Sequence, residues 1–168
     1  SEMCIRDSNK RGCQGTEIPD ADDRDKNDRI GETVMAVTKI LARRGGLAQA
    51  IAYVVNGDKT EEQVLTATQG CSIGSACAEM QDAKIRWNKT DGVQLYHIIQ
   101  SFRPGEITPG LALEIAQEFV REHLPGYQAV IGIHTDREHI HAHIIFNSVN
   151  QFTGEKYHSN CLLYTSPS

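Results

Sequence analysis

Hydrophobic and polar positions alternate most clearly late in the chain, between residues 139 and 147. Histidines occupy positions 139, 141 and 143, and apolar residues occupy positions 140, 142, 144 and 146. Successive residues of a strand point to opposite faces, so the pattern predicts a strand with one histidine face and one core face. Residues 128–134 are apolar and β-branched, and the polar residues 135–138 have the length of a hairpin loop. The two stretches therefore predict an antiparallel hairpin.

The assumed loop sets the register of this hairpin. If residues 135–138 form the loop, His134 faces His139 and Gly132 faces His141. Directly opposed residues project to the same side of a sheet, so His134 would join the histidine face. Gly132, with no side chain, would leave open space beside His141 for an ion and a substrate phosphate.

The rest of the chain shows alternating strand and helix patterns. Apolar periodicity, capping residues and breakers predict the following elements in order: a strand at 36–41, a helix at 47–55 ended by Asn56-Gly57, a strand at 65–69, a helix at 75–87, a strand at 95–102, and a helix capped by Thr108, with Pro109 at its first position, that ends at Pro125-Gly126. This order is typical of an α+β fold in which helices pack on a largely antiparallel sheet.

Length and composition indicate one globular domain. The chain has 168 residues, of which 39% are hydrophobic and 23% charged. Residues 1–34 lack apolar periodicity and are expected to be disordered or a non-native flank. Residues 161–168, which look like sequencing-adapter read-through, are also expected to be a non-native flank. The structured domain is then 35–160, truncated at its C-terminal end.

Composition excludes several classes of protein. No stretch is long and apolar enough to span a membrane, and no signal peptide is recognisable. The five cysteines are scattered, without the spacing of a disulfide framework or a zinc knuckle. The net charge of −5 leaves no basic footprint for strong non-specific DNA binding.

Four histidines on one hairpin face predict a metal site. The alternatives are a solvated edge strand and core histidines satisfied by hydrogen bonds. By ligand softness, imidazoles favour zinc, manganese or cobalt over magnesium.

The motif His134-x-Asp136-x-x-His139-x-His141-x-His143, followed by Asn147, resembles the third motif of relaxases, the nucleases of plasmid mobilisation. Four more stretches resemble the P-type, tyrosine-using members of that family: Met35–Ile40, Ala50–Thr60, Tyr96–Glu106 and Lys156–Asn160. The resemblance implies the HUH endonuclease fold, a ferredoxin-like antiparallel sheet. Its two central strands would carry the histidines, and an adjacent helix would carry a tyrosine nucleophile.

The resemblance also implies roles for individual residues. The metal ligands would be His134, His141 and His143, because the position of His139 is not uniformly histidine in the family. Asp136 would orient a ligand or take a proton, and Asn147 would brace the strand end or contact DNA. Tyr53 falls at the nucleophile position, with Tyr96 and Tyr157 as competitors. Ser101 falls in the second motif, which holds DNA near the cut. The implied cofactor is Mg²⁺ or Mn²⁺, with Zn²⁺ possible in a purified protein.

The implied function is site- and strand-specific nicking and rejoining of DNA at a transfer origin through a 5′-phosphotyrosyl intermediate. Its partners would be single-stranded DNA, accessory mobilisation proteins and a coupling protein, in the bacterial cytoplasm and without membrane insertion. The alternatives are a rolling-circle replication initiator or transposase of the same superfamily, a zinc-dependent hydrolase without a covalent step, and a nucleic-acid-binding module with a structural metal or none.

Overall fold

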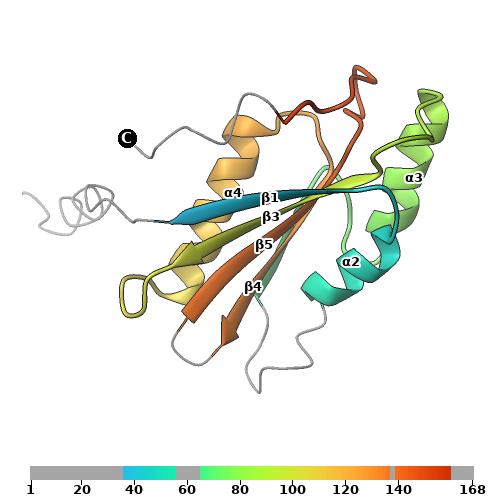
Figure 1. Ribbon diagram of the computed structural model, residues 1–168. Coiled ribbons are helices and arrows are strands. Elements are labelled where there is room, and N and C mark those ends of the chain that lie inside the picture. Colours follow the sequence, from blue (N-terminus) through green and yellow to red (C-terminus); the bar gives the residue numbers. More distant parts are fainter. Residues whose placement is uncertain (1–35, 56–64, 137–138, 160–168) are drawn as a thin grey trace, which may run out of the picture. The chain divides into compact units, whose positions relative to one another are not determined.

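The computed structural model describes residues 36–55, 65–136 and 139–159 (Figure 1). The chain divides into two units, Ser1–Thr33 and Val34–Ser168, and all described residues belong to the second. Its elements, in chain order, are β1 (Val37–Arg43), α2 (Leu47–Val55), β2 (Leu65–Gln69), α3 (Ala76–Arg86), β3 (Leu95–Phe102), α4 (Pro109–His123), β4 (Ala129–Asp136) and β5 (His139–Asn147). In this part of the chain, none of the helices has the length and apolar character needed to cross a bilayer.

The strands form one five-stranded antiparallel sheet in the order β1-β3-β5-β4-β2. The strand β5 lies at its centre between β3 and β4, and β1 and β2 are the edges. The predicted α+β fold with an antiparallel sheet is confirmed, and the two strands of the histidine hairpin are central in the sheet, as the resemblance implied.

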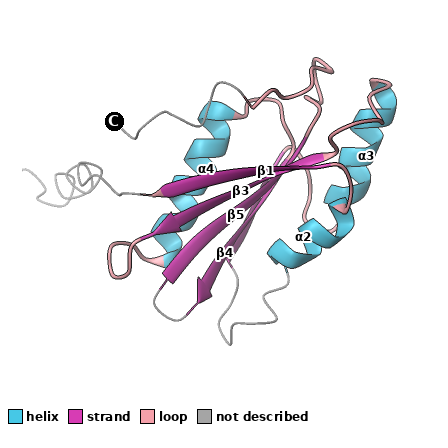
Figure 2. Ribbon diagram, viewed as in Figure 1, coloured by secondary structure: helices cyan, strands magenta, loops and turns pink. Residues whose placement is uncertain are grey.

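Helices cover both faces of the sheet: α4 lies on one face, and α2 and α3 on the other (Figures 1 and 2). The alternation of β5 explains this arrangement. Ile144 and Phe146 are buried in one apolar cluster with Val120 of α4, whereas Ile145 is buried in a second cluster with Val54 of α2. Each face of β5 therefore packs against a different helix layer.

The helix α4 forms as its sequence predicts. Thr108 is the N-cap, its hydroxyl accepting a hydrogen bond from the backbone N–H of Leu111 at 3.3 Å, and Pro109 begins the helix. Its buried stripe packs on the sheet and consists of Ala112, Ala116 and Val120. The helix positions no histidine of the site, so its contribution is to the core beneath the sheet.

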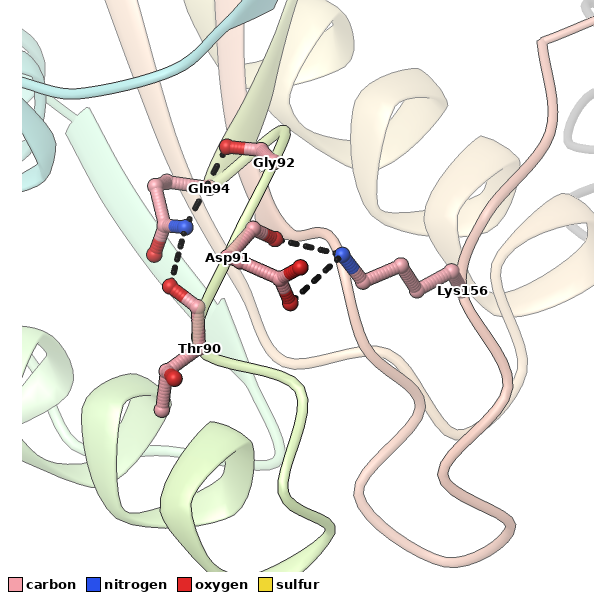
Figure 3. Close-up of polar contacts among 5 residues, drawn as sticks. All are labelled: Thr90, Asp91, Gly92, Gln94 and Lys156. Atoms are coloured by element: carbon pink, nitrogen blue, oxygen red, sulfur yellow. Dashed lines mark hydrogen bonds and ion pairs between the residues drawn. The ribbon is translucent and has the colours of Figure 1, made fainter.

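The segment after β5 returns to the turn that leads into β3 (Figure 3). The ammonium of Lys156 donates to the backbone oxygen of Asp91 and lies 3.9 Å from its carboxylate. Within the same turn, the amide of Gln94 donates to the backbone oxygens of Thr90 at 2.8 Å and Gly92 at 3.3 Å. These contacts fix the start of β3, the strand that passes beside the histidines.

Candidate active site

Three histidines from β4 and β5 lie on one face of the sheet. His134 pairs directly with His141, and the ring centroids of His134 and His143 are 4.5 Å apart. The ring centroids of His141 and His143 are 6.3 Å apart. The predicted grouping of these histidines on one face is therefore present.

The predicted hairpin register was wrong by two residues. The strand β4 continues to Asp136, which pairs with His139, so the loop is two residues shorter at its start than the sequence indicated. His134 consequently faces His141, and Gly132 faces His143. A shift of two preserves which side chains share a face. The polar residues at 135 and 136 belong to the strand, which the sequence pattern did not reveal.

Gly132 does not leave open space for an ion or a phosphate. A Cβ atom added at this position would lie 2.3 Å from the backbone oxygen of Val54 and 2.6 Å from its Cγ1 atom. Because Gly132 has no side chain, the backbone of the last turn of α2 can pack directly against the backbone of β4. The ring of His134 also reaches this turn, since its Nε2 atom lies 3.1 Å from the backbone oxygen of Val54.

Tyr53, in the last turn of α2, lies over the histidines. Its ring centroid is 5.3 Å from that of His134, 5.5 Å from that of His143 and 6.5 Å from that of His97, each in an edge-to-face arrangement. The side chain remains 53% exposed. Tyr53 is thus close to the imidazoles and accessible from solvent, as a nucleophile toward a large substrate must be.

The competing tyrosines are placed differently. Tyr96 and Tyr157 are buried in the cluster under α4, on the opposite face from the histidines. The Tyr96 hydroxyl donates to the backbone oxygen of Tyr157 at 3.0 Å, and burial raises its pKa. Both rings therefore serve the core.

His97 of β3 is a site residue that the sequence reasoning missed. It is 5% exposed, and its Nε2 atom lies 3.0 Å from Nδ1 of His143. Its Nδ1 atom is buried without a hydrogen-bond partner. The only available signal was its position four residues before Ser101, which puts both side chains on the same face of one strand.

Hydrogen bonds orient two of the proposed ligands. The Ser101 hydroxyl, on β3, lies 3.0 Å from Nδ1 of His141. A carbonyl oxygen can only accept, so Nε2 of His134 carries the hydrogen that it shares with Val54, and its Nδ1 carries the lone pair. Ser101 is thus placed to position His141.

Burial keeps the inner imidazoles uncharged. It lowers the pKa of His143 to about 3, with neighbouring His134 as the next cause. It lowers the pKa of His97 to about 4, with the charge of Arg43 as the next cause. Both rings are therefore neutral at physiological pH, which is the form of histidine that binds metals.

The histidines fit a divalent metal by donor chemistry, although their nitrogens do not converge. Among the residues that the structure describes, no group of three histidine, cysteine, aspartate or glutamate side chains is arranged to hold an ion. Three neighbouring imidazoles, one of them buried and neutral, are nevertheless a donor set that divalent transition metals accept. His139 is the outermost histidine; it is exposed and stacks on His141 at 6.2 Å.

The last two predicted site residues differ in what is described of them. Asn147 is fully buried, and its amide donates at 3.0 Å both to the backbone oxygen of Met80 and to Oε1 of Gln128. This placement braces the end of β5, and it leaves no surface for the contact with DNA that was the other expectation. The backbone of Asp136 ends β4, and its side chain lies outside the described part of the structure.

Comparison with known proteins identifies the family of the chain. A family model described as "Relaxase: MobA/VirD2-like, nuclease domain" matches residues 53–166. The chain belongs to the relaxase family. It is 38% identical over 126 residues to the protein rlx of Staphylococcus aureus, which covers 75% of this chain and 38% of that protein.

A second relative is the group II intron-interrupted relaxase LtrB of Lactococcus lactis subsp. cremoris. It is 34% identical over 138 residues, covering 66% of this chain and 24% of LtrB. The chain therefore spans between about a quarter and two fifths of the length of these relaxases. The part of the chain that the family model matches is described there as a nuclease domain.

Proposed function

We propose that this chain nicks one strand of DNA at a transfer origin and remains attached to it through Tyr53. The observation that carries the proposal is the half-exposed Tyr53 ring lying within 5.5 Å of the rings of His134 and His143. The match to a relaxase nuclease domain supports DNA as the substrate class. Accessory mobilisation proteins and a coupling protein are the further partners proposed for the whole protein.

The covalent step is a transesterification. The Tyr53 oxygen attacks the scissile phosphorus, a new P–O bond forms to the tyrosine, and the bond to the 3′ oxygen breaks. The phenol loses its proton, and the 3′ oxygen leaves as a hydroxyl after taking one up. The product keeps a phosphodiester-like bond, so attack by a 3′ hydroxyl reverses the step and rejoins the strand.

The proposed ligands of a divalent ion are His134, His141 and His143. Bound there, Mg²⁺ or Mn²⁺ would withdraw charge from the phosphoryl oxygens. His141 is oriented by the hydroxyl of Ser101, which is also proposed to meet the DNA near the cut. Asp136 is proposed to accept the phenol proton or to orient a ligand imidazole.

The test is formation of a covalent adduct. The chain is incubated with Mn²⁺ and labelled single-stranded oligonucleotides from the transfer origin of its own element, and the products are separated on a denaturing gel. Wild type is expected to give a slow-migrating protein–DNA band, which Tyr53→Phe abolishes. Tyr127→Phe is the matched control, since this half-buried tyrosine packs on Phe146 under the opposite face.

Three outcomes would redirect the proposal. An adduct that persists in Tyr53→Phe overturns the nucleophile assignment. Cleavage without an adduct in both proteins favours a hydrolase that uses an activated water. An adduct that forms equally in excess chelator overturns the role of the metal.

A further inference from the structure

A pocket of 360 Å³ opens beside Tyr53, between α2 and the strands β1, β3 and β5. It falls within the size range of ligand pockets in proteins. Its lining residues come from four elements: Leu41, Arg43, Gln49, Ala50, Tyr53, His97, Ile99 and His143. The pocket thus shares Tyr53 and His143 with the proposed nicking site and extends away from them toward β1.

The lining combines an apolar wall with a polar end. Leu41 on β1 and Ile99 on β3 are apolar, and both are partly buried. Gln49 lies four residues before Tyr53 on α2, so the two side chains share one face of the helix. The pocket therefore runs along that face, from Tyr53 back toward Gln49.

Arg43 is the only lysine or arginine among the eight lining residues. A guanidinium stays charged at every physiological pH and binds phosphate oxygens with two parallel hydrogen bonds. The charge of Arg43 also helps to lower the pKa of the buried His97, which lines the same pocket. The cationic end and the proposed nucleophile thus border the same pocket.

We propose that this pocket holds the nucleotide that adjoins the scissile phosphate, with its base against Leu41 and Ile99 and its phosphate paired with Arg43. The inference rests on the proposed function, because it assumes that a DNA strand reaches Tyr53. A strand whose phosphate lies at Tyr53 must continue past one side of this residue, and the pocket offers space, an apolar wall and a cation there. The Gln49 amide, with a donor and an acceptor, can reach the edge of the base.

The first test measures the salt dependence of DNA binding. Fluorescein-labelled oligothymidylate is titrated with wild type, Arg43→Gln and Arg44→Gln at several salt concentrations, and binding is followed by anisotropy. Arg44 is the matched control, since it is exposed and is not among the lining residues. Loss of one phosphate contact should weaken binding and reduce the slope of log K against log salt by about 0.7 in Arg43→Gln. An equal change in both variants, or no saturable binding by wild type, would overturn the proposal.

The second test places a negative charge inside or outside the pocket. Gln49→Glu and Ala48→Glu change the net charge equally at neighbouring exposed positions of α2, but only residue 49 lines the pocket. Gln49→Glu is expected to weaken oligothymidylate binding several-fold more than Ala48→Glu, and equal effects would contradict the pocket. Circular dichroism checks that each variant is folded. If both binding tests give the expected results but wild type forms no adduct, the nicking proposal fails and the proposal that the pocket binds a nucleotide is kept.

Discussion

The Nε2 atom of His97 lies 3.0 Å from Nδ1 of His143, and the two buried imidazoles link β3 to β5 on the face that carries Tyr53. His143 can bind an ion through Nε2 only if its hydrogen is on Nδ1. In that state His97 must accept the hydrogen bond through its own Nε2 atom. His97 is therefore placed to accept the hydrogen bond in the form of His143 that could bind an ion through Nε2.

Replacing His97 is expected to weaken metal binding. His97→Leu removes the acceptor and should lower the affinity for Mn²⁺ about 10- to 100-fold by calorimetry, as changes behind a metal ligand commonly do. His97→Gln, whose side-chain oxygen can accept the same hydrogen bond, should restore most of the affinity. The exposed His158→Gln is the control. Nitrogen-15 NMR should show the hydrogen of His143 on Nδ1 in the Mn²⁺-free wild type; unchanged affinity in His97→Leu would contradict the role.

Adding one carbon at Gly132 is expected to move the end of α2. In Gly132→Ala the new methyl group would overlap the backbone oxygen of Val54, the residue after Tyr53. Overpacking of this kind typically costs about 1–3 kcal/mol, measurable by urea unfolding, and adduct formation should slow because Tyr53 shifts. Gly110→Ala is the control: nothing lies within 4 Å of its new methyl group, and alanine in a helix should stabilise by up to about 1 kcal/mol. Equal stability of the two variants would show that α2 and β4 are not in close contact.

Asn147 is expected to affect stability and not DNA binding. Asn147→Leu leaves Oε1 of Gln128 without this donor, at a cost of about 1–3 kcal/mol if the atom stays buried, and it removes the bond that ties the backbone oxygen of Met80 to β5. Thermal unfolding gives this loss. The affinity for single-stranded DNA, measured well below the unfolding transition, should match that of wild type. A loss of affinity at unchanged stability would instead indicate a contact with DNA.

Lys84 on α3 is expected to make stability rise with pH. Burial lowers its pKa from 10.5 to about 8, and its ammonium nitrogen is buried without a hydrogen-bond partner. Between pH 8 and 10.5 the unfolded chain holds a proton that the folded chain has released, so raising the pH through this window favours folding. Below pH 8 the charge of Lys84 lowers the stability of the folded chain.

The comparison with Lys84→Met isolates this effect from other titrating groups, such as the thiol of Cys71, whose pKa burial raises to about 11. Lys84→Met should be more stable than wild type at pH 7, and the difference should shrink as the pH approaches 10.5. A difference that stays constant with pH would mean that Lys84 is not buried in its charged form.

Much of the fold could be predicted because local patterns decide it. The alternation at 139–147 placed three histidines on one face, and the cap at Thr108 placed the start of α4. The hairpin register could not be predicted. Thr135 and Asp136 are polar and resemble loop residues, but hydrogen bonding to β5 keeps them in the strand.

His97 shows why part of the site was missed. A single histidine between Tyr96 and Ile98 in an apolar strand resembles a core residue. Its partner, His143, is identified only by the pairing of β3 with β5. In that pairing Ile99 faces His143, and His97 is the diagonal neighbour of His143 on the same face. Contacts between strands distant in sequence decide such a role, and no local pattern records them.

The alternation of β5 also separates substitutions that affect folding from substitutions that affect the site. Substitutions at Ala142, Ile144 or Phe146 enter the core under α4, so they should act on folding before they act on chemistry. Substitutions at His141 or His143 enter the other face, where Tyr53 is the neighbour of His143. A change on the histidine face can therefore alter the site while the core face still holds the sheet together, and a change on the core face can unfold the chain while every histidine is kept.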